Sequence, residues 1–434
     1  MNCNPTSRPL LKNFDAIIIG SGVIGCSISL SLSREKLRTL NIDTLPAAGY
    51  GSTSHSSAII RPFYSHTVSC ALAHEARHRW VNWREHLDFS PQPIARYVET
   101  GGLILIRDGT EHEYENNLTV LKNVGVEFAM LSPKEIIEMY PGISLQSFGP
   151  PKRRNEEGFG APVPGEITGG IFMPESGYVS DPQLATTNLR IAAEHNGANF
   201  RFNITATSIL KESGKVSGVR LSNGEIISAP ILINAAGPHS STINELAGIV
   251  SDLAVETKPH RHEVVYLKAT EGYRKNAGFV LDLDSGVYQK PSGTDMVIGS
   301  ADPKCDTPEV VHPDSYDNQF TDQWTTQALR TAQRWPKLGI ENNARGTVGL
   351  YDVSNDWIPI YDRTDLPGFY LAIGTSGNQF KNAPIVGDLM ARIIENPDHD
   401  HAASQLLLNH LGRTIDLSFY SRNREIKQTA SVMA

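Results

Sequence analysis

A short apolar run, Ala16 to Ile19, begins the patterned part of the chain and predicts a buried β-strand. Glycines follow this run, and the segment after them is typical of a helix. A second strand then ends near Asp43. Strand, turn, helix and strand in this order predict a β-α-β unit at the start of the chain.

Further along, helix-like and strand-like segments alternate. Residues 66–88 are typical of an amphipathic helix, and residues 97–106 of a strand with a glycine pair near its start. The other predicted elements are helices over 133–139, 181–197 and 322–334, short strands over 200–233 with a turn at Asn223-Gly224, a strand-rich region over 255–298, and a strand over 368–374 leading into a helix that ends at 394. This mixture predicts two domains, each assembled from non-contiguous segments.

Residues 149–170 are the most loop-like segment of the chain, rich in proline, glycine and mixed charge. Long loops in compact domains are often lids or binding loops. A solvated insertion is an equally good interpretation of this segment.

The glycines after the first strand have the spacing of a phosphate-binding turn. Gly20, Gly22 and Gly25 form G-x-G-x-x-G between a strand and a helix. The first glycine permits the tight turn, the second lets the backbone approach a pyrophosphate, and the third lets the helix pack on the strand. An acid about 20 residues later holds a ribose hydroxyl in such sites, and Asp43 stands at that place. The pattern predicts a bound dinucleotide.

Composition narrows the class of protein. The chain has 434 residues and a net charge of −8, which excludes a broad nucleic-acid-binding surface. Its four cysteines form no CxxC pair and indicate neither a disulfide framework nor a structural zinc site. No apolar run reaches the roughly 18 residues of a membrane span, and the first residues lack a signal-peptide core. We expect a cytoplasmic protein, with peripheral membrane association left open.

Two histidine motifs offer other chemistry. His74-Glu75-Ala-Arg-His78 is an H-E-x-x-H on a predicted helix, so the alternative from another enzyme class is a zinc hydrolase with Glu75 as its base. The glycine that continues this motif in metzincins is absent, and we expect no metal. His260 and His262 adjoin an apolar strand, and we interpret them as lining or flanking a substrate pocket or as an exposed sheet edge.

Five separated stretches together resemble one family. They are the glycine turn at 20–25, Gly51-Ser-Thr-Ser-His-Ser-Ser-Ala-Ile-Ile-Arg61, Met173-Pro-Glu-Ser-Gly-Tyr-Val-Ser-Asp-Pro182, Asn234-Ala-Ala-Gly-Pro238 and Gly374-Thr-Ser-Gly-Asn-Gln-Phe-Lys381. In order and spacing the chain resembles the D-amino-acid oxidase/sarcosine oxidase family of flavoproteins. The resemblance implies FAD rather than NAD.

The resemblance also implies a fold. We expect an α/β protein in which a Rossmann-like FAD-binding domain of the glutathione-reductase type carries a second, β-rich α+β substrate domain. The predicted FAD-binding domain is discontinuous, over 12–95, 160–250 and 341–420, and the predicted substrate-binding domain covers 96–159 and 251–340.

The resemblance carries a set of cofactor residues. Small residues at 51–54 can pass under a flavin, and Asn234 to Gly237 end a strand with the small side chains that close approach requires. We expect Gly374 to Gly377 to open the last long helix, so that its dipole faces the flavin. The predicted cofactor-binding residues are Gly20, Gly22, Gly25, Asp43, Gly51, Ser52, Thr53, Ser54, His55, Ala236, Gly237, Gly374, Ser376, Gly377 and Lys381.

The same resemblance places the substrate. Arg61 matches an arginine that pairs the substrate carboxylate in sarcosine-type members, and Lys381 matches a lysine that assists it. An arginine fork and an ammonium converging on one carboxylate is sound recognition chemistry. Tyr288 stands where the family places an aromatic residue in the substrate pocket.

Two departures from the family pattern shape the expected activity. Val297 occupies the position of a lysine that promotes reaction with oxygen in monomeric sarcosine oxidases, which favours a dehydrogenase. The stretch 346–351 lacks the cysteine that tethers FAD in those enzymes. Gly51-Ser-Thr-Ser-His55 instead resembles the tethering motif of dimethylglycine dehydrogenases, so covalent attachment at His55 is a hypothesis.

The predicted function is FAD-dependent oxidation of the C–N bond of a small amino acid, secondary, N-methylated or D-configured, to an imine that hydrolyses. Electrons would pass to an acceptor protein or a quinone. Two alternatives stay open: a flavin dehydrogenase of 2-hydroxy acids, and the flavoprotein subunit of a hetero-oligomeric complex like sarcosine oxidase.

Overall fold

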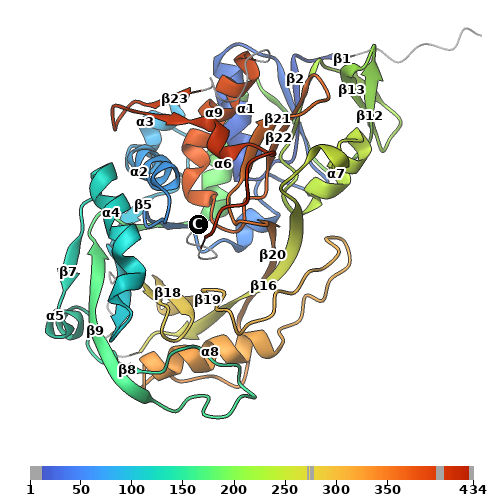
Figure 1. Ribbon diagram of the computed structural model, residues 1–434. Helices are drawn as coiled ribbons and strands as arrows, with labels where there is room; N and C mark the ends of the chain where they lie inside the picture. The colour runs from blue at the N-terminus through green and yellow to red at the C-terminus, as the bar shows by residue number, and fades with distance from the viewer. Residues whose placement is uncertain (1–11, 271–272, 274–277, 397–404, 430–434) are drawn as a thin grey trace, which may run out of the picture.

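The computed structural model describes residues 12–270, 273, 278–396 and 405–429. Its upper layer in Figure 1 is built on a six-stranded sheet in the order β11-β3-β2-β15-β22-β21, parallel except for the last strand. Three of these strands, β2, β3 and β22, are buried at every residue, as parallel strands covered on both faces must be. The strands are β11 (Asn199–Arg201), β3 (Thr39–Ile42), β2 (Ala16–Ile19), β15 (Ile231–Asn234), β22 (Phe369–Ile373) and β21 (Ile360–Arg363).

Different layers cover the two faces of this sheet. Ile18 packs in the cluster formed with helices α1 (Val23–Arg34), α6 (Pro182–His195) and α9 (Ala383–Glu395). Ile17, its neighbour in the strand, points to the opposite cluster, because successive side chains of a strand alternate. That second cluster is formed with α7 (Ser240–Ala247) and a four-stranded sheet of β1 (Lys12–Asn13), β14 (Ile226–Ser228), β13 (Lys215–Leu221) and β12 (Ala206–Glu212).

A nine-stranded sheet forms the lower layer in Figure 1. The helices α8 (Asp322–Arg334) and α5 (Pro133–Met139) cover one of its faces, where Ile136 and Trp324 join a separate hydrophobic cluster. The sheet order is β20 (Gly346–Ser354), β16 (Thr257–Lys268), β19 (Asp295–Ser300), β18 (Val287–Ser292), β17 (Phe279–Asp282), β6 (Gly102–Arg107), β9 (Val163–Met173) and β7 (Ala129–Leu131), with β8 (Gln146–Ser147) paired to β9.

A smaller set of elements connects these layers. A three-stranded sheet, β4-β10-β5, joins a segment that follows the first β-α-β unit to one that precedes α6. The strands are β4 (Ile59–Ile60), β10 (Gly177–Val179) and β5 (Tyr97–Glu99); the remaining elements are α2 (Thr67–Val81), α3 (Trp83–Leu87), α4 (Glu115–Val124) and the hairpin β23 (Gln405–Leu408) with β24 (Arg413–Asp416). None of the helices that the structure describes is both long and apolar enough to cross a bilayer.

The expected fold class is confirmed, since the chain combines a mainly parallel sheet under helices with a large β-rich layer. The helices predicted over 133–139 and 322–334 form with those bounds. The predicted domain ranges remain a prediction. Of the strands inside the ranges expected for the FAD-binding domain, β9 and β20 belong to the nine-stranded sheet.

Three predicted elements were wrong in part. The helix over 66–88 is interrupted at Asn82, and the strand over 97–106 separates into β5 and β6. The loop-like segment 149–170 contains the start of β9, because two of its glycines, Gly169 and Gly170, serve close packing rather than a turn. A Cβ at Gly170 would lie 2.6 Å from Leu103 Cδ1, and one at Gly169 would lie 2.8 Å from the carbonyl oxygen of Leu131.

Candidate active site

The glycine turn joins β2 to α1, and two of its three glycines are required by the protein itself. A Cβ on Gly20, whose φ is +110°, would stand 2.2 Å from the carbonyl oxygen of Ala235. A Cβ on Gly25 would stand 2.1 Å from the carbonyl oxygen of Gly20. Gly22 is different, because a Cβ there would meet only Thr53 Oγ1, at 3.4 Å. Gly22 at the N-terminus of α1 therefore has more room beside it than the other two glycines, and a helix N-terminus is where a phosphate would bind.

Asp43 follows β3 and bends back toward the glycine turn. Its carboxylate accepts hydrogen bonds from the backbone N–H of Ser21 at 2.6 Å and of Leu45 at 2.9 Å. Burial raises the pKa of this carboxyl despite the two backbone donors. The acid predicted to hold a ribose hydroxyl thus stands at the glycine turn, positioned by the backbone.

Residues 51–55 pack between the glycine turn and the nine-stranded sheet. They form a 3₁₀ turn, Ser52–His55. Thr53 Oγ1 accepts the N–H of Val23 in α1 at 3.2 Å, and Ser52 Oγ donates to the carbonyl of Leu350 in β20 at 2.6 Å. His55 Nδ1 is hydrogen-bonded to Thr347 Oγ1, and burial lowers the pKa of this imidazole. The predicted flavin turn therefore bridges both sheets.

The turn from Gly374 to Gly377 corrects one expectation. It does not open the last helix, because α9 begins at Ala383. Gly374, Ser376 and Gly377 all have positive φ, which an α-helix does not tolerate. The N–H of Gly374 donates to the Asp352 carboxylate at 2.6 Å, and the N–H of Ser376 donates to the Asp352 carbonyl at 2.7 Å. The helix dipole therefore does not act at these glycines.

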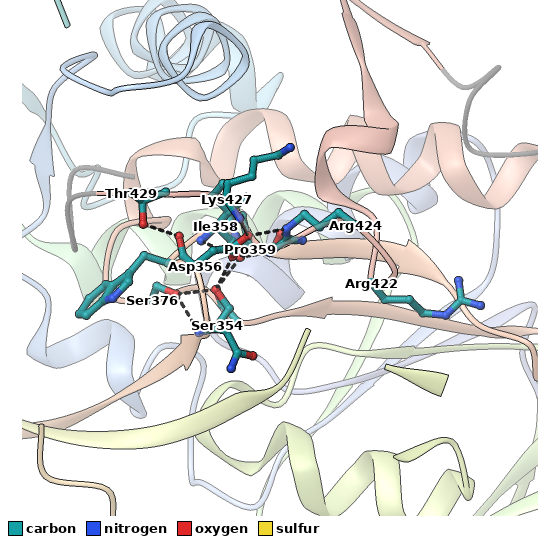
Figure 2. Close-up of polar contacts among 12 residues, drawn as sticks. Ser354, Asp356, Ile358, Pro359, Ser376, Arg422, Arg424, Lys427 and Thr429 are labelled. Carbon is teal, nitrogen blue, oxygen red and sulfur yellow. Dashed lines mark hydrogen bonds and ion pairs between the residues drawn. The ribbon is translucent and has the colours of Figure 1, made fainter. Parts of the chain in front are cut away.

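The last described residues of the chain stabilise the turn from Gly374 to Gly377. Arg424 forms a two-pronged ion pair with Asp356, with Nε and Nη2 at 2.9 and 2.7 Å from the two carboxylate oxygens. Thr429 Oγ1 donates to the Asp356 carbonyl at 2.8 Å, and Ser354 lies between this acid and Ser376 (Figure 2). Arg424 and Thr429 thus fasten the C-terminal segment, through Asp356 and Ser354, to the turn at 374–377.

Arg61, Lys381 and Tyr288, predicted from distant stretches, line one cavity. Arg61 follows β4, Tyr288 lies in β18, and Lys381 lies in the 3₁₀ turn Phe380–Asn382 before α9. The cavity lies where the three-stranded sheet, the nine-stranded sheet and this turn meet. The lining includes further residues that the sequence did not single out: Ser57, Ile59, Phe279, Tyr351 and Asn378.

The two cations of this cavity are buried side by side. Arg61 is 7% exposed and donates to the carbonyl of Phe63, and Lys381 is 5% exposed and donates to the carbonyl of Asn378 at 2.6 Å. Both lie near the ring of Tyr64, at 5.0 and 5.5 Å from its centroid. Burial and the neighbouring Arg61 charge hold the pKa of Lys381 well below its usual value. A bound anion would relieve this repulsion.

Two tyrosines, Tyr288 and Tyr351, line the same cavity as these cations. Ser57 Oγ and Tyr288 Oη are 3.3 Å apart, and burial raises the pKa of Tyr288. The ring of Tyr288 occupies the space over Gly299, where a Cβ would come within 2.3 Å of the tyrosine. Tyr351 stacks on His262 with ring centroids 4.1 Å apart. His262 therefore flanks the pocket, as one of the interpretations of its motif proposed.

Comparison with known proteins identifies the family. The sequence model of the DAO family, described as FAD dependent oxidoreductase, matches residues 15–393. The chain belongs to this family of FAD-dependent oxidoreductases.

Relatives and solved structures resemble this FAD-dependent oxidoreductase over most of its length. It is 24% identical over 399 residues to the sarcosine oxidase subunit beta of Arthrobacter sp, covering 90% of this chain and 89% of that protein. It is 25% identical over 299 residues to mitochondrial sarcosine dehydrogenase of Homo sapiens, covering 68% of this chain but 29% of that longer protein. The crystal structure of L-proline dehydrogenase from P. horikoshii superposes with a TM-score of 0.75 at 22% identity, covering 96% of this chain and 98% of that one.

The residues present fit the cofactor of the family. The room beside Gly22 at the N-terminus of α1 suits a pyrophosphate, and Gly237, with φ of +55°, has no atom within 4 Å of where a Cβ would stand. Asp43 adjoins the glycine turn through its bond to Ser21. In this oxidoreductase the predicted FAD residues from four separate stretches therefore border the C-terminal ends of the parallel strands, where open α/β sheets bind ligands.

The H-E-x-x-H motif of this oxidoreductase has a structural role. Glu75 is 2% exposed, and its carboxylate accepts the backbone N–H groups of His410 and Leu411, each at 3.1 Å. Burial lowers the pKa of His74 and of His78 to about 4. In the described part of the chain no group of three or more histidine, cysteine or acidic side chains is arranged to hold a metal ion. These contacts fasten α2 to the β23–β24 hairpin and do not support the zinc hydrolase alternative.

Proposed function

We propose that this FAD-dependent oxidoreductase oxidises the C–N bond of a small amino acid, secondary, N-methylated or D-configured, to an imine that then hydrolyses. The observation that carries the proposal is the pair of buried cations, Arg61 and Lys381, beside Tyr288 in one cavity. Relatives named sarcosine oxidase and sarcosine dehydrogenase, and fold neighbours named L-proline dehydrogenase and glycine oxidase, support the same reaction class.

The side chains of the cavity bind and orient the substrate. Arg61 and Lys381 would take the carboxylate, whose charge offsets the repulsion between two buried cations. Holding the acid in one place fixes the direction of the neighbouring C–H bond, and such orientation lowers the barrier for the transfer that follows. Tyr288 and Ser57 offer hydroxyl groups to the same cavity. When bound, FAD supplies the acceptor for the hydride.

The cofactor would be held by the residues that fit it. The N-terminus of α1 and Gly22 would face the pyrophosphate, Asp43 the ribose, and the turn from Ser52 to His55 the flavin. Covalent attachment at His55 stays a hypothesis; its Nδ1 is hydrogen-bonded to Thr347, so Nε2 would be the atom that carries the flavin. Mass spectrometry of the denatured protein tests it: a peptide containing residues 51–61 without added flavin mass contradicts the tether.

We propose a dehydrogenase rather than an oxidase. Val297, at the position of the oxygen-activating lysine of monomeric sarcosine oxidases, is buried in β19. Lys290 of β18 lies opposite it, and Tyr266 of β16 lies on its other side. Reoxidation of the reduced protein separates the two activities. We expect slow reaction with dissolved oxygen and fast reaction with an artificial quinone; the reverse order contradicts this assignment.

A partner subunit is the alternative that one observation favours. The Arthrobacter relative is named a subunit, and the alignment covers nine-tenths of it. A hetero-oligomeric flavoprotein would show weak activity alone. Gel filtration of the purified chain together with an artificial-acceptor assay distinguishes a chain that is active alone from one that needs a partner subunit. An isolated chain that is fully reduced by substrate needs no partner for the chemistry.

The decisive experiment is anaerobic reduction of the flavin. The purified protein is titrated with sarcosine, N-methylated, cyclic and D-amino acids, and the loss of flavin absorbance is followed. We expect bleaching by one of these amines and none by the corresponding 2-hydroxy acids. Bleaching by hydroxy acids alone would assign the 2-hydroxy-acid dehydrogenase alternative.

A further inference from the structure

Lys290 lies on the face of the nine-stranded sheet that borders the substrate cavity. It is two residues after Tyr288 in β18, so the two side chains point to the same side. Val280 pairs with Gln289 between β17 and β18, which places Phe279, another cavity residue, beside Lys290. The lysine is therefore a neighbour of two residues that line the cavity.

A second sheet closes over the lysine. Its Nζ lies 4.3 Å from the ring centroid of Tyr178 in β10. Tyr178 is paired in register with Ile59 in β4, and Ile59 also lines the cavity. Lys290 is not itself one of the lining residues, but it is next to cavity residues on two different sheets, Phe279 through β17 and Ile59 through Tyr178.

No carboxylate of the described residues pairs with the charge of Lys290. The residue is 7% exposed, and the described residues give it no carboxylate within ion-pair distance. Other buried cations of this chain do have such partners: Arg261 with Glu263 at 2.8 Å, Arg334 with Asp282 at 2.8 Å and Arg424 with Asp356 at 2.7 Å. Burial alone lowers the pKa of Lys290 to about 8. A buried ammonium without an anion is costly unless a ligand supplies one.

We propose that Lys290 receives a second carboxylate of the substrate, so that this site takes amino acids that carry two acidic groups. The inference rests on the proposed function, in which Arg61 and Lys381 take the first carboxylate. A single ammonium beside an aromatic ring matches the one negative charge of a carboxylate, whereas a phosphate dianion needs more donors than this corner offers. Lys290 is then a specificity-determining residue, and the substrate reaches from Arg61 and Lys381 to Lys290.

Binding of acids that cannot be oxidised tests the proposal without turnover. Diglycolate and glutarate are compared with methoxyacetate and pentanoate by calorimetry on the flavin-loaded protein. We expect each diacid to bind about 10-fold more tightly than its monoacid, and Lys290→Met to bring this ratio to about 1. Lys258→Met is the matched control, because Lys258 lies in the same sheet but is exposed and paired with Glu256. Equal affinities in the wild type overturn the proposal.

Turnover separates the proposal from the function on which it rests. Iminodiacetate and N-(2-carboxyethyl)glycine are compared with sarcosine and N-propylglycine as reductants of the flavin. We expect the diacids to have the higher kcat/KM through a lower KM, and Lys290→Met to raise that KM while leaving the KM of sarcosine unchanged. If no amine reduces the flavin but diacids still bind through Lys290, the amine oxidation is wrong and the second acid site stands. If Lys290→Met slows only reoxidation of the flavin, the lysine serves the acceptor and the proposal is wrong.

Discussion

Buried cations of this protein have two kinds of surroundings. Arg424 is held by a carboxylate and organises the fold, whereas Arg61 and Lys381 donate to backbone carbonyls and line a cavity. A cation that is bound by a carboxylate of its own chain has little left to offer a ligand. Lys290, with an aromatic ring as its neighbour, belongs to the second kind. The neighbours of a buried cation, rather than its charge alone, therefore indicate which side chains carry the proposed chemistry.

The carboxylate clamp has a direct test in Arg61→Met. Losing one of two cations on a buried carboxylate removes about 2–5 kcal/mol of binding, so kcat/KM falls by about 30-fold or more. The measurement is anaerobic flavin reduction, and the flavin absorbance of the purified variant shows that the cofactor is still bound. A variant with full FAD and unchanged kcat/KM would contradict the clamp.

Lys381 sets an upper limit to the pH range of activity. The substrate amine must lose a proton to react, so activity rises with pH at first. Burial lowers the pKa of Lys381, so its charge is lost as the pH rises through that lowered value and the clamp weakens. We expect kcat/KM to fall again at alkaline pH in the wild type. In Lys381→Met the profile starts lower and this falling limb is absent.

Lys290 also affects how the free energy of unfolding depends on pH. Its folded pKa of about 8 lies below the value of about 10.4 in an unfolded chain, so between these values the unfolded state binds more protons and stability rises with pH. The destabilisation is full below about pH 8 and fades toward pH 10.4. Lys290→Met should therefore unfold at a higher denaturant concentration than the wild type at pH 7, with the gain shrinking by pH 10. A midpoint that falls at pH 7 contradicts an unmatched charge.

At the scale of elements, the β2–α1 turn combines two demands in three glycines. Gly20 and Gly25 are required for the strand and helix to approach each other, since a Cβ on either would overlap a backbone oxygen. Gly22, at the N-terminus of α1, would bring a Cβ only into ordinary contact with Thr53 Oγ1, so we expect a ligand rather than packing to require it. One motif therefore contains both a packing requirement and a binding requirement.

Substitution by alanine separates these requirements. Gly25→Ala places a methyl group 2.1 Å from the Gly20 carbonyl oxygen, so we expect a poorly folded protein. Gly22→Ala meets only Thr53 Oγ1 at 3.4 Å, so we expect a folded protein whose circular dichroism matches the wild type but which has lost FAD. The measurements are thermal unfolding and flavin content. A Gly22→Ala protein that keeps its full complement of flavin would show that the cradle does not hold the pyrophosphate.

At the scale of the whole molecule, the C-terminal segment links both layers of the fold to the site. Arg424 and Thr429 contact Asp356 in the loop between β20 and β21, one strand from each sheet (Figure 2). Ser354 at the end of β20 is hydrogen-bonded to Ser376 in the turn that precedes Lys381. The geometry of the cavity therefore depends on residues near the end of the sequence.

Breaking this link should destabilise the whole protein. Arg424→Met leaves the buried Asp356 carboxylate without its ion pair, and such a change costs about 3–5 kcal/mol of unfolding free energy. The exposed pair Arg38–Asp15 is the control, and Arg38→Met should leave stability unchanged. Denaturant unfolding measures both. Equal stability of the two variants would show that the C-terminal segment is not fastened through Arg424.

The local pattern of the sequence determined the elements that contain their own start and stop signals. The helix at 133–139 has its capping serine, proline and glutamate in sequence, and the glycine turn has its strand and helix on either side. The prediction that Gly374 to Gly377 open a helix was wrong because the conformation of this turn is set by a distant residue. Asp352, which binds the N–H groups of Gly374 and Ser376, is more than 20 residues away in the sequence and belongs to the other sheet. Local pattern does not contain such a partner.

The sequence by itself determined the dinucleotide turn, the fold class and, through the family resemblance, three residues of one cavity. Only the tertiary structure decided which cations keep their charge available. In the sequence Lys290 and Arg424 are both cationic residues with nothing to tell their roles apart. In the fold Lys290 faces an aromatic ring and Arg424 faces a carboxylate. The physical reason is that the cost of a buried charge depends on what the fold brings within a few ångströms of it, and those neighbours come from strands far apart in sequence.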